Sequence, residues 1–394
     1  RVAVMAPTRY EWAVVDFATW YAGGVVVPVY ETSSVEQAAL ILDQTRPVVA
    51  IAGGEDQRAT LAAASATLGR GPADLALHTM DAGADDLTAL RAAGLDVPDA
   101  EIERRRRLAG PDDLATVVFT SGTTGGLKGV RITHGNLVGE ALPVQAGYAD
   151  VVNDRAATVI ILPLAHILAR GLQMVSVLAG MRISHQGNPR EAVASLARVQ
   201  PTFMVVVPRV LDKIRSAVRA KAAEKRLGAL FRMAELTAME WASHLECHAD
   251  DPTLRPAPGL RARRALFDIL FYRRIRTLLG GRMEYLLSGA APLERHLSLF
   301  FTGIGVPVIE GYGLTETTAP VTGLRPGDLR AGSVGVPIPG ATVRIAADGE
   351  VLVKGVGVTP GYLDPADDAD AFVDGFLRTG DLGSLDDRGR LTLH

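Results

Sequence analysis

The chain opens with strand, helix, glycine stop and strand in succession, and this order restricts its fold more than any other feature. β-Branched runs predict strands at Val2–Met5 and Val25–Val29. An apolar stripe around Val15 predicts a helix between them, which Gly23 and Gly24 end. Two strands joined through a helix form a crossover unit, so the sequence predicts a mainly parallel sheet.

The same alternation continues, and the chain of 394 residues is too long for one ordinary domain. We therefore predict an α/β fold of two stacked α/β subdomains, at 1–185 and 186–324, and a small β-barrel-like subdomain at 325–394. A hairpin across Asp348-Gly349 supports the last part. Further strands are predicted at Val48–Ile51, Thr116–Phe119, Thr158–Leu162, Phe203–Val207, Glu284–Leu287 and Val306–Ile309, and helices at Ala192–Val199 and from Arg209 to about His248.

Composition excludes several classes of protein. A net charge of −3 gives no general attraction to nucleic acid or an anionic membrane. No apolar run reaches the roughly 18 residues of a membrane-spanning helix. The single cysteine, Cys247, rules out an intrachain disulfide framework and indicates a cytoplasmic location. His244 and His248 lie four apart on a predicted helix, but without a third ligand they do not indicate zinc.

The segment Thr120–Gly129 holds four glycines, three threonines, one serine and one lysine. Its backbone can approach a ligand closely, and its N–H groups, hydroxyls and Lys128 suit a polyphosphate. The segment follows a predicted strand, and Thr133 is the predicted N-cap of a helix beginning near His134. Leu127 and Gly129 flank Lys128, which is not the pattern of a kinase-type phosphate loop.

A second polar segment, Glu310–Thr318, follows the predicted strand Val306–Ile309 at the sheet edge where α/β folds bind ligands. Tyr312 lies between two glycines, so its ring is free to contact a base. Glu316 offers a carboxylate for Mg²⁺.

Three further segments remain open to more than one interpretation from the residues alone. Small residues at Ser288–Leu293 suit either a close ligand or a tight turn. Asp381 suits either two ribose hydroxyls or a hairpin turn. His166 follows a predicted strand and is either a buried structural histidine or part of a site.

Together, the glycine-rich segment, the Gly-Tyr-Gly-Leu-Thr-Glu segment and the Thr-Gly-Asp triplet resemble the adenylate-forming enzymes. Leu162–His166, Val207–Val210 and Gly311–Thr317 are most similar to long-chain fatty acyl-CoA synthetases of the bacterial type. The resemblance implies a fatty acid substrate, ATP, Mg²⁺ and CoA. A carboxylate would attack ATP to give acyl-adenylate and pyrophosphate, and CoA would then take the acyl group.

The resemblance also implies roles for individual residues. His166 would lie near the substrate carboxylate, Lys128 and Thr315 would contact phosphates, Glu316 would bind Mg²⁺, and these four form the predicted catalytic set. Tyr312 would stack on adenine and Asp381 would bind ribose. The predicted nucleotide-binding set comprises Thr120, Ser121, Gly122, Thr123, Thr124, Gly125, Lys128, Gly289, Ala290, Ala291, Glu310, Gly311, Tyr312, Gly313, Thr315 and Asp381.

The sequence departs from the family pattern in two places. Leu127 stands where a proline usually precedes the lysine, which loosens the backbone but removes no donor. The chain ends at His394, about where the family's hinge and C-terminal lid domain begin. We therefore expect a chain that binds ATP and a fatty acid but is impaired in turnover.

Other functions are compatible with the same motifs. One alternative is a fatty acyl-AMP ligase that loads a carrier protein, and another is a non-catalytic ligand-binding homologue. A solvated helix is the favoured interpretation of the arginines around Leu266–Tyr272, and weak peripheral contact with the inner membrane surface is the alternative. These are Arg261, Arg263, Arg264, Arg273, Arg274, Arg276 and Arg282.

Overall fold

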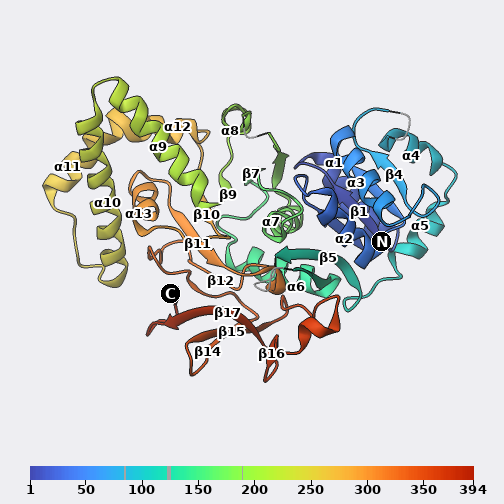
Figure 1. Cartoon of the computed structure of the whole chain (residues 1–394). Helices are drawn as coiled ribbons and strands as arrows, with labels where there is room; N and C mark the ends of the chain where they lie inside the picture. The colour runs from blue at the N-terminus through green and yellow to red at the C-terminus, as the bar shows by residue number, and fades with distance from the viewer. Residues whose placement is uncertain (84–85, 122–125, 189) are drawn as a thin grey trace.

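The computed structural model describes residues 1–83, 86–121, 126–188 and 190–394. Its sheets and helices form two α/β bodies side by side, with an antiparallel sheet lying below both in the view of Figure 1. The predicted α/β class with mainly parallel sheets is confirmed. The division at 185 and 324 stays a prediction, and β13 (Val336–Pro337) pairs with the second large sheet although it lies beyond residue 324.

The first sheet has the strand order β4-β3-β1-β2-β5-β6, and only β6 is antiparallel to its neighbour. The predicted strand and helix at the N-terminus are present as β1 and α1. The strands are β1 (Val2–Met5), β2 (Val26–Val29), β3 (Val49–Ala52), β4 (Ala76–Thr79), β5 (Leu114–Ser121) and β6 (Leu127–Thr133). The helices are α1 (Tyr10–Tyr21), α2 (Val35–Thr45), α3 (Glu55–Thr67), α4 (Leu87–Ala93) and α5 (Asp99–Arg106).

Strand β6 differs from the sequence expectation, which ran directly from the glycine-rich segment to a helix. It pairs with β5 along its whole length, and Thr120 stands opposite Lys128. Val130 and Ile132 are buried, as alternation along a strand requires. Helix α6 begins only after β6, with Thr133 as its N-cap, as predicted. Paired strands β5 and β6 therefore flank the glycine-rich segment, and Lys128 belongs to β6.

A central group of elements connects the two bodies. It contains α6 (His134–Gly147), α7 (Ile167–Leu178), α8 (Ala192–Val199) and the parallel pair β7 (Ala157–Ile160) and β8 (Arg182–His185). Arg170 of α7 is fully buried and forms an ion pair of 2.6 Å with Asp16 of α1 and a hydrogen bond with Thr116 of β5. These contacts fix α7 against the first sheet.

The second large sheet has the order β13-β12-β11-β10-β9, with β9, β10 and β11 parallel. Its strands are β9 (Phe203–Val206), β10 (Tyr285–Ser288), β11 (Val308–Tyr312), β12 (Thr322–Gly323) and β13. The long helical region predicted from Arg209 is two helices, because Arg226 between them has a φ of 58°. The helices are α9 (Pro208–Glu224), α10 (Gly228–Asp250), α11 (Pro258–Phe267), the π-helical η1 (Asp268–Tyr272), α12 (Arg273–Leu278) and α13 (Arg295–Gly303).

The C-terminal sheet is antiparallel and curled, with the order β14-β15-β17-β16 and β18 beside β17. The predicted hairpin across Asp348-Gly349 joins β14 to β15. Backbone hydrogen bonds from Arg131 to Gly361 and from Leu363 to Gly129 attach this part to β6. Its elements are β14 (Ala341–Ile345), β15 (Glu350–Gly355), β16 (Phe372–Val373), β17 (Phe376–Leu385), β18 (Leu391–Leu393) and the 3₁₀ turn η3 (Pro365–Asp368).

No helix among the described residues is long and apolar enough to cross a membrane. The exposed arginines Arg104–Arg107 are ion-paired with Glu101 and Glu103 of the same helix.

Candidate active site

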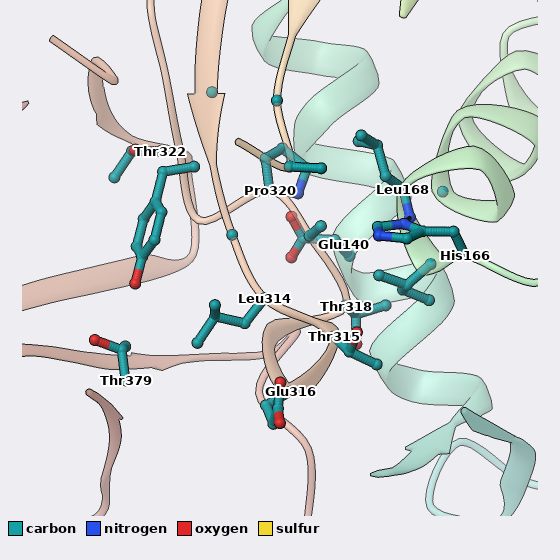
Figure 2. Close-up of a pocket in the computed structure, with 18 of the residues that line it drawn as sticks. Glu140, His166, Leu168, Leu314, Thr315, Glu316, Thr318, Pro320, Thr322 and Thr379 are labelled. Atoms are coloured by element: carbon teal, nitrogen blue, oxygen red, sulfur yellow. Dashed lines mark hydrogen bonds between the residues drawn. The ribbon is translucent and has the colours of Figure 1, made fainter. Parts of the chain in front are cut away.

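A single cavity of about 830 Å³ lies where the first sheet, the central helices, the second sheet and the C-terminal sheet meet. Figure 2 shows part of its wall. One side of the wall is apolar and the other carries hydroxyls, carboxylates and amines. The cavity can therefore hold a ligand with an apolar part and a polar, charged part.

The apolar wall is built by one face of α6, one face of α7 and the central strands of the second sheet. Apart from the adjacent Ile167 and Leu168, successive lining positions on each helix are three or four residues apart, which places them on one helical face. They are Leu137, Ala141, Val144 and Tyr148 of α6, Ile167, Leu168, Leu172 and Val175 of α7, and Phe203, Val205, Leu287 and Ile309 of the sheet. This half suits an alkyl chain.

The polar wall carries three side-chain contacts between segments distant in the sequence. Tyr312 donates a hydrogen bond of 2.7 Å from its hydroxyl to Asp381 Oδ2. Tyr362 donates one of 3.0 Å to Glu316 Oε1. Lys128 Nζ lies 3.0 Å from Asp367 Oδ1. The polar groups are thus oriented before any ligand binds.

His166 lies at the N-terminus of α7, near the junction of the two walls (Figure 2). Its Nδ1 accepts a hydrogen bond of 3.1 Å from the Leu168 N–H, so it caps the helix. Burial lowers the pKa of the imidazole, which favours the neutral form at pH 7. With Nδ1 as acceptor, the neutral ring carries its proton on Nε2, which can donate to a ligand.

The structure brings together most of the residues that the sequence singled out. Thr120, Lys128, His166, Gly289, Ala290, Gly311, Tyr312, Gly313, Thr315, Glu316 and Asp381 all line the cavity. Ala291 is exposed and lies outside the wall. Gly122, Thr123, Thr124 and Gly125, and the side chain of Ser121, lie outside the described residues.

Glu310 also lies outside the wall. Its carboxyl is buried toward Ser298 of α13, and burial raises its pKa to about 7. As a member of β11 it alternates with Ile309 and Gly311, which face the cavity. Its side chain therefore points to the opposite side of the strand.

Several wall residues are absent from the sequence prediction, among them Tyr362, Asp367, Arg378 and Glu140. Tyr362 and Asp367 reach the cavity only because residues 361–363 pair with β6, a contact that no local pattern encodes. Arg378 is held to Glu350 by hydrogen bonds of 2.8 and 2.7 Å. Glu140 is a single carboxyl on the apolar face of α6, and that break in the pattern could have identified it.

A metal ion bound here would need additional ligands that do not come from the described residues, such as phosphate and water. The described residues contain no group of three or more His, Cys, Asp or Glu that could hold an ion by themselves. Glu316 offers an oxygen at the polar wall, which fits an Mg²⁺ that takes its other ligands from phosphate and water.

The chain belongs to the AMP-binding enzyme family, whose model matches residues 1–363.

Two relatives that match along the whole chain are named as long-chain-fatty-acid–CoA ligases. The chain is 38% identical over 397 aligned residues to the long-chain-fatty-acid–CoA ligase FadD15 of Mycobacterium tuberculosis, covering 100% of this chain and 64% of that protein. It is 29% identical to the human long-chain-fatty-acid–CoA ligase 1, covering 100% of this chain and 58% of that protein. It thus spans less than two thirds of the length of these relatives.

Solved structures support the fold. The N-terminal domain of FACL13 from Mycobacterium tuberculosis matches with a TM-score of 0.71 and 22% identity, covering 100% of this chain and 86% of that chain. ATP-bound MatB from Rhodopseudomonas palustris matches with a TM-score of 0.69 and 23% identity, covering 100% of this chain and 68% of that chain.

Proposed function

We propose that this chain activates a fatty acid with ATP, giving acyl-adenylate and pyrophosphate, and that a protein containing it then transfers the acyl group to CoA. The observation that carries the proposal is the continuity of the cavity. An apolar wall suited to an alkyl chain meets a polar wall bearing Lys128, Thr315 and Glu316, with His166 near the junction. The names of the FadD15 relatives agree with this substrate class.

The proposed chemistry has two steps. In the first, a carboxylate oxygen bonds to the α-phosphorus of ATP and the bond to the β-phosphate oxygen breaks, which releases pyrophosphate. In the second, the CoA sulfur bonds to the acyl carbon, AMP leaves and the thiol proton passes to solvent. The first step brings an anion toward a polyanion, so a site must supply positive charge and hydrogen-bond donors.

The residues of the wall can supply them. Lys128 would attract the terminal phosphates, and one unit charge at about 4 Å is worth on the order of 4 kcal/mol at an effective dielectric near 20. The hydroxyl of Thr315 would donate to the α-phosphate. The neutral His166 would donate from Nε2 to the substrate carboxylate without forming an ion pair that weakens the nucleophile.

The nucleotide's other end would meet Tyr312 and Asp381. Asp381 accepts a hydrogen bond from the Tyr312 hydroxyl, which fixes the orientation of its carboxylate. Its remaining lone pairs would accept from the ribose hydroxyls, and the tyrosine ring would stack on the base. Mg²⁺ at Glu316 would neutralise phosphate charge.

Acyl-adenylate formation is the direct test. We expect the chain, given ATP, Mg²⁺ and dodecanoate, to release pyrophosphate and form dodecanoyl-AMP detectable by mass spectrometry. Lys128→Gln should lower the rate, whereas Lys213→Gln on α9, outside the cavity wall, should not. ATP binding without acyl-adenylate from any C12 to C18 acid would contradict the proposal.

A separate experiment identifies the molecule that accepts the acyl group. CoA and a phosphopantetheinylated carrier protein would be offered to a protein containing this chain, and acylation of CoA is expected. Acylation of the carrier alone would establish the acyl-AMP ligase alternative. Binding of both ligands without any turnover, in a longer protein as well, would establish a non-catalytic homologue.

The 394-residue chain by itself is proposed to turn over slowly, since it spans 64% of FadD15. Pyrophosphate release by this chain and by whole FadD15 would be compared under the same conditions. Equal rates would contradict the idea.

We propose a cytoplasmic location, with a solvated helical segment at α11, η1 and α12 and weak contact with the inner membrane surface as the alternative. Leu266, Ile269 and Leu278 are exposed there beside several arginines. Arg263 and Arg276 are ion-paired with Glu240 and Asp268, which leaves less positive charge for a membrane. Replacing Arg261, Arg273 and Arg274 by glutamine should leave sedimentation with anionic liposomes unchanged, and reduced sedimentation would establish the membrane contact.

A further inference from the structure

Glu140 is the only carboxyl on the cavity-lining face of α6. Leu137, Ala141 and Val144 share that face with it. The residue is 7% exposed, and its Oε1 has no hydrogen-bond partner within the described part of the chain. Buried polar atoms are nearly always paired, so one that is not paired in a cavity wall points to a ligand.

Within the described part of the chain, the backbone of residues 356–358 forms no hydrogen bond with Glu140 Oε1. The carbonyls of Val356 and Val358 accept from Asn136, and the Gly357 carbonyl accepts from Thr318. A Cβ at position 357 would lie 2.5 Å from Glu140 Oε2, so the glycine leaves just enough room for the carboxyl.

No ion pair among the described residues joins Glu140 to a cation of the neighbouring elements. β5, β6 and α7 pack against α6. Among their charged groups, Lys128 pairs with Asp367 and Arg170 pairs with Asp16. Within the described residues no ion pair joins Glu140 to either of them, to Arg131 of β6 or to His166 of α7. Burial alone raises the pKa of Glu140 to about 8.

A neutral carboxylic acid is a hydrogen-bond donor. Figure 2 shows Glu140 grouped with His166, Thr315 and Thr318 in one part of the cavity. The Nε2–H of His166 is a second neutral donor in that part. Two donors beside an apolar wall fit a ligand that has acceptor atoms at one end and an alkyl chain attached to them. An unsubstituted fatty acid has acceptors only at its carboxylate.

We propose that Glu140, as a neutral acid, donates a hydrogen bond to the carboxylate of the acyl substrate and so distinguishes a fatty acid from the same chain without a carboxylate. This inference rests on the proposed function. It assigns a substrate-binding role to a residue of α6 that the phosphate, adenine and ribose motifs do not include. Ionised Glu140 would repel a carboxylate, so affinity for the fatty acid should fall as pH rises through and above about 8.

Two variants distinguish the hydrogen-bond donor of Glu140 from the volume of its side chain. Glu140→Gln keeps a donor of the same shape and cannot ionise, whereas Glu140→Met keeps the unbranched shape and has no donor. Dissociation constants would be measured by titration calorimetry for dodecanoate and for 1-dodecanol. ATP affinity and thermal unfolding would confirm that each variant is folded.

The expected pattern is specific to ligand and pH. Glu140→Met should weaken dodecanoate binding about 10-fold or more at pH 7 and leave 1-dodecanol binding unchanged, as expected for a lost hydrogen bond to a charged group. Glu140→Gln should keep the affinity of the wild type at pH 7 and abolish the fall above pH 8. Wild-type affinity in Glu140→Gln together with weak binding in Glu140→Met would exclude a purely structural role.

Three results would overturn the inference. Glu140→Met could leave dodecanoate affinity unchanged, or it could weaken the binding of dodecanoate and 1-dodecanol equally. It could also weaken only the binding of 3-hydroxydodecanoate, which would mean that Glu140 contacts a chain substituent. In each case a wild type that still forms dodecanoyl-AMP keeps the proposed function intact. A wild type that binds no dodecanoate and forms no dodecanoyl-AMP would overturn both proposals.

Discussion

Tyr312 and Asp381 are 69 residues apart in the sequence and are joined by a hydrogen bond of 2.7 Å from the tyrosine hydroxyl to Oδ2. The bond connects β11 of the second sheet to β17 of the C-terminal sheet. Tyr312 is buried around its ring, and its hydroxyl reaches the cavity wall. The proposed adenine and ribose contacts are therefore held in one fixed relation.

Tyr312→Phe should keep the ring and remove this bond. Asp381 would lose its fixed donor, so we expect ATP affinity to fall about 3- to 10-fold, in line with about 1 kcal/mol for a typical hydrogen bond. Calorimetric titration with ATP measures this. Tyr30→Phe removes a hydroxyl outside the cavity wall and is the matched control. Unchanged affinity in Tyr312→Phe would contradict the proposed role of the pair.

Some elements of this structure can be predicted from the sequence, and others cannot. Val2–Met5 and Phe203–Val206 form strands as predicted, because short β-branched runs in a parallel sheet are buried on both faces. Tyr312 and Glu316 line the cavity at and just after the end of β11, as expected for the carboxyl end of a parallel strand, whereas Asp381 reaches it from β17 of the C-terminal sheet.

Other features depend on distant contacts or carry a weak local signal. Lys128 and Gly129 are typical of a turn, so the sequence does not predict strand β6, although burial of Val130 and Ile132 alternates as in a strand. Tyr362 and Asp367 reach Lys128 only after residues 361–363 pair with β6. No periodicity over ten residues encodes such a contact.

Asp367 competes with phosphate for Lys128 in the structure. The amine lies 3.0 Å from Asp367 Oδ1, and both side chains are about a quarter exposed. Removing the carboxylate charge should leave Lys128 available, so Asp367→Asn is expected to raise ATP affinity about 3- to 10-fold at low salt. The gain should shrink at 0.5 M salt, because exposed charges are screened.

Asp374→Asn is the control for this effect, because Asp374 is exposed, pairs with Arg344 and lies outside the cavity wall. Titrations of both variants with ATP at two salt concentrations would separate a local effect from net charge. A lower ATP affinity in Asp367→Asn would mean that Asp367 helps to bind the nucleotide.

His166 should give the proposed reaction an acid limit. Its pKa is lowered by burial, so the neutral ring persists below the ordinary histidine value of about 6.5. Protonation at Nδ1 would also remove the acceptor for the Leu168 N–H. Because the folded state prefers the neutral ring, stability from this group is present above pH 6.5 and is lost as pH falls through the lowered pKa.

The measurement is pyrophosphate release and urea unfolding between pH 5 and 8. His166→Asn keeps an N-cap acceptor and should lose the acid limit, at a lower rate throughout. His166→Ala should also lose about 1 kcal/mol of unfolding free energy, since alanine cannot cap α7. An acid limit that persists in His166→Asn would assign it to another group.

Gly171 allows the apolar wall to be changed without disturbing the fold. It lies inside α7 and lines the cavity, and a Cβ there would meet nothing closer than the Ala319 carbonyl at 3.7 Å. Glycine in a helix interior costs about 0.5–1 kcal/mol relative to alanine. Gly171→Ala should therefore raise the unfolding free energy by roughly that amount in urea titrations.

Gly171→Leu should weaken binding in the apolar half of the cavity without changing the polar half. Its side chain would extend between α7 and the segment around Ala319, into space that the proposal assigns to the alkyl chain. We expect dodecanoate affinity to fall more than 10-fold while ATP affinity stays within a factor of two, because the polar wall is unchanged. Dodecanoate binding that survives in a folded, ATP-binding Gly171→Leu would place the alkyl chain elsewhere than along α7.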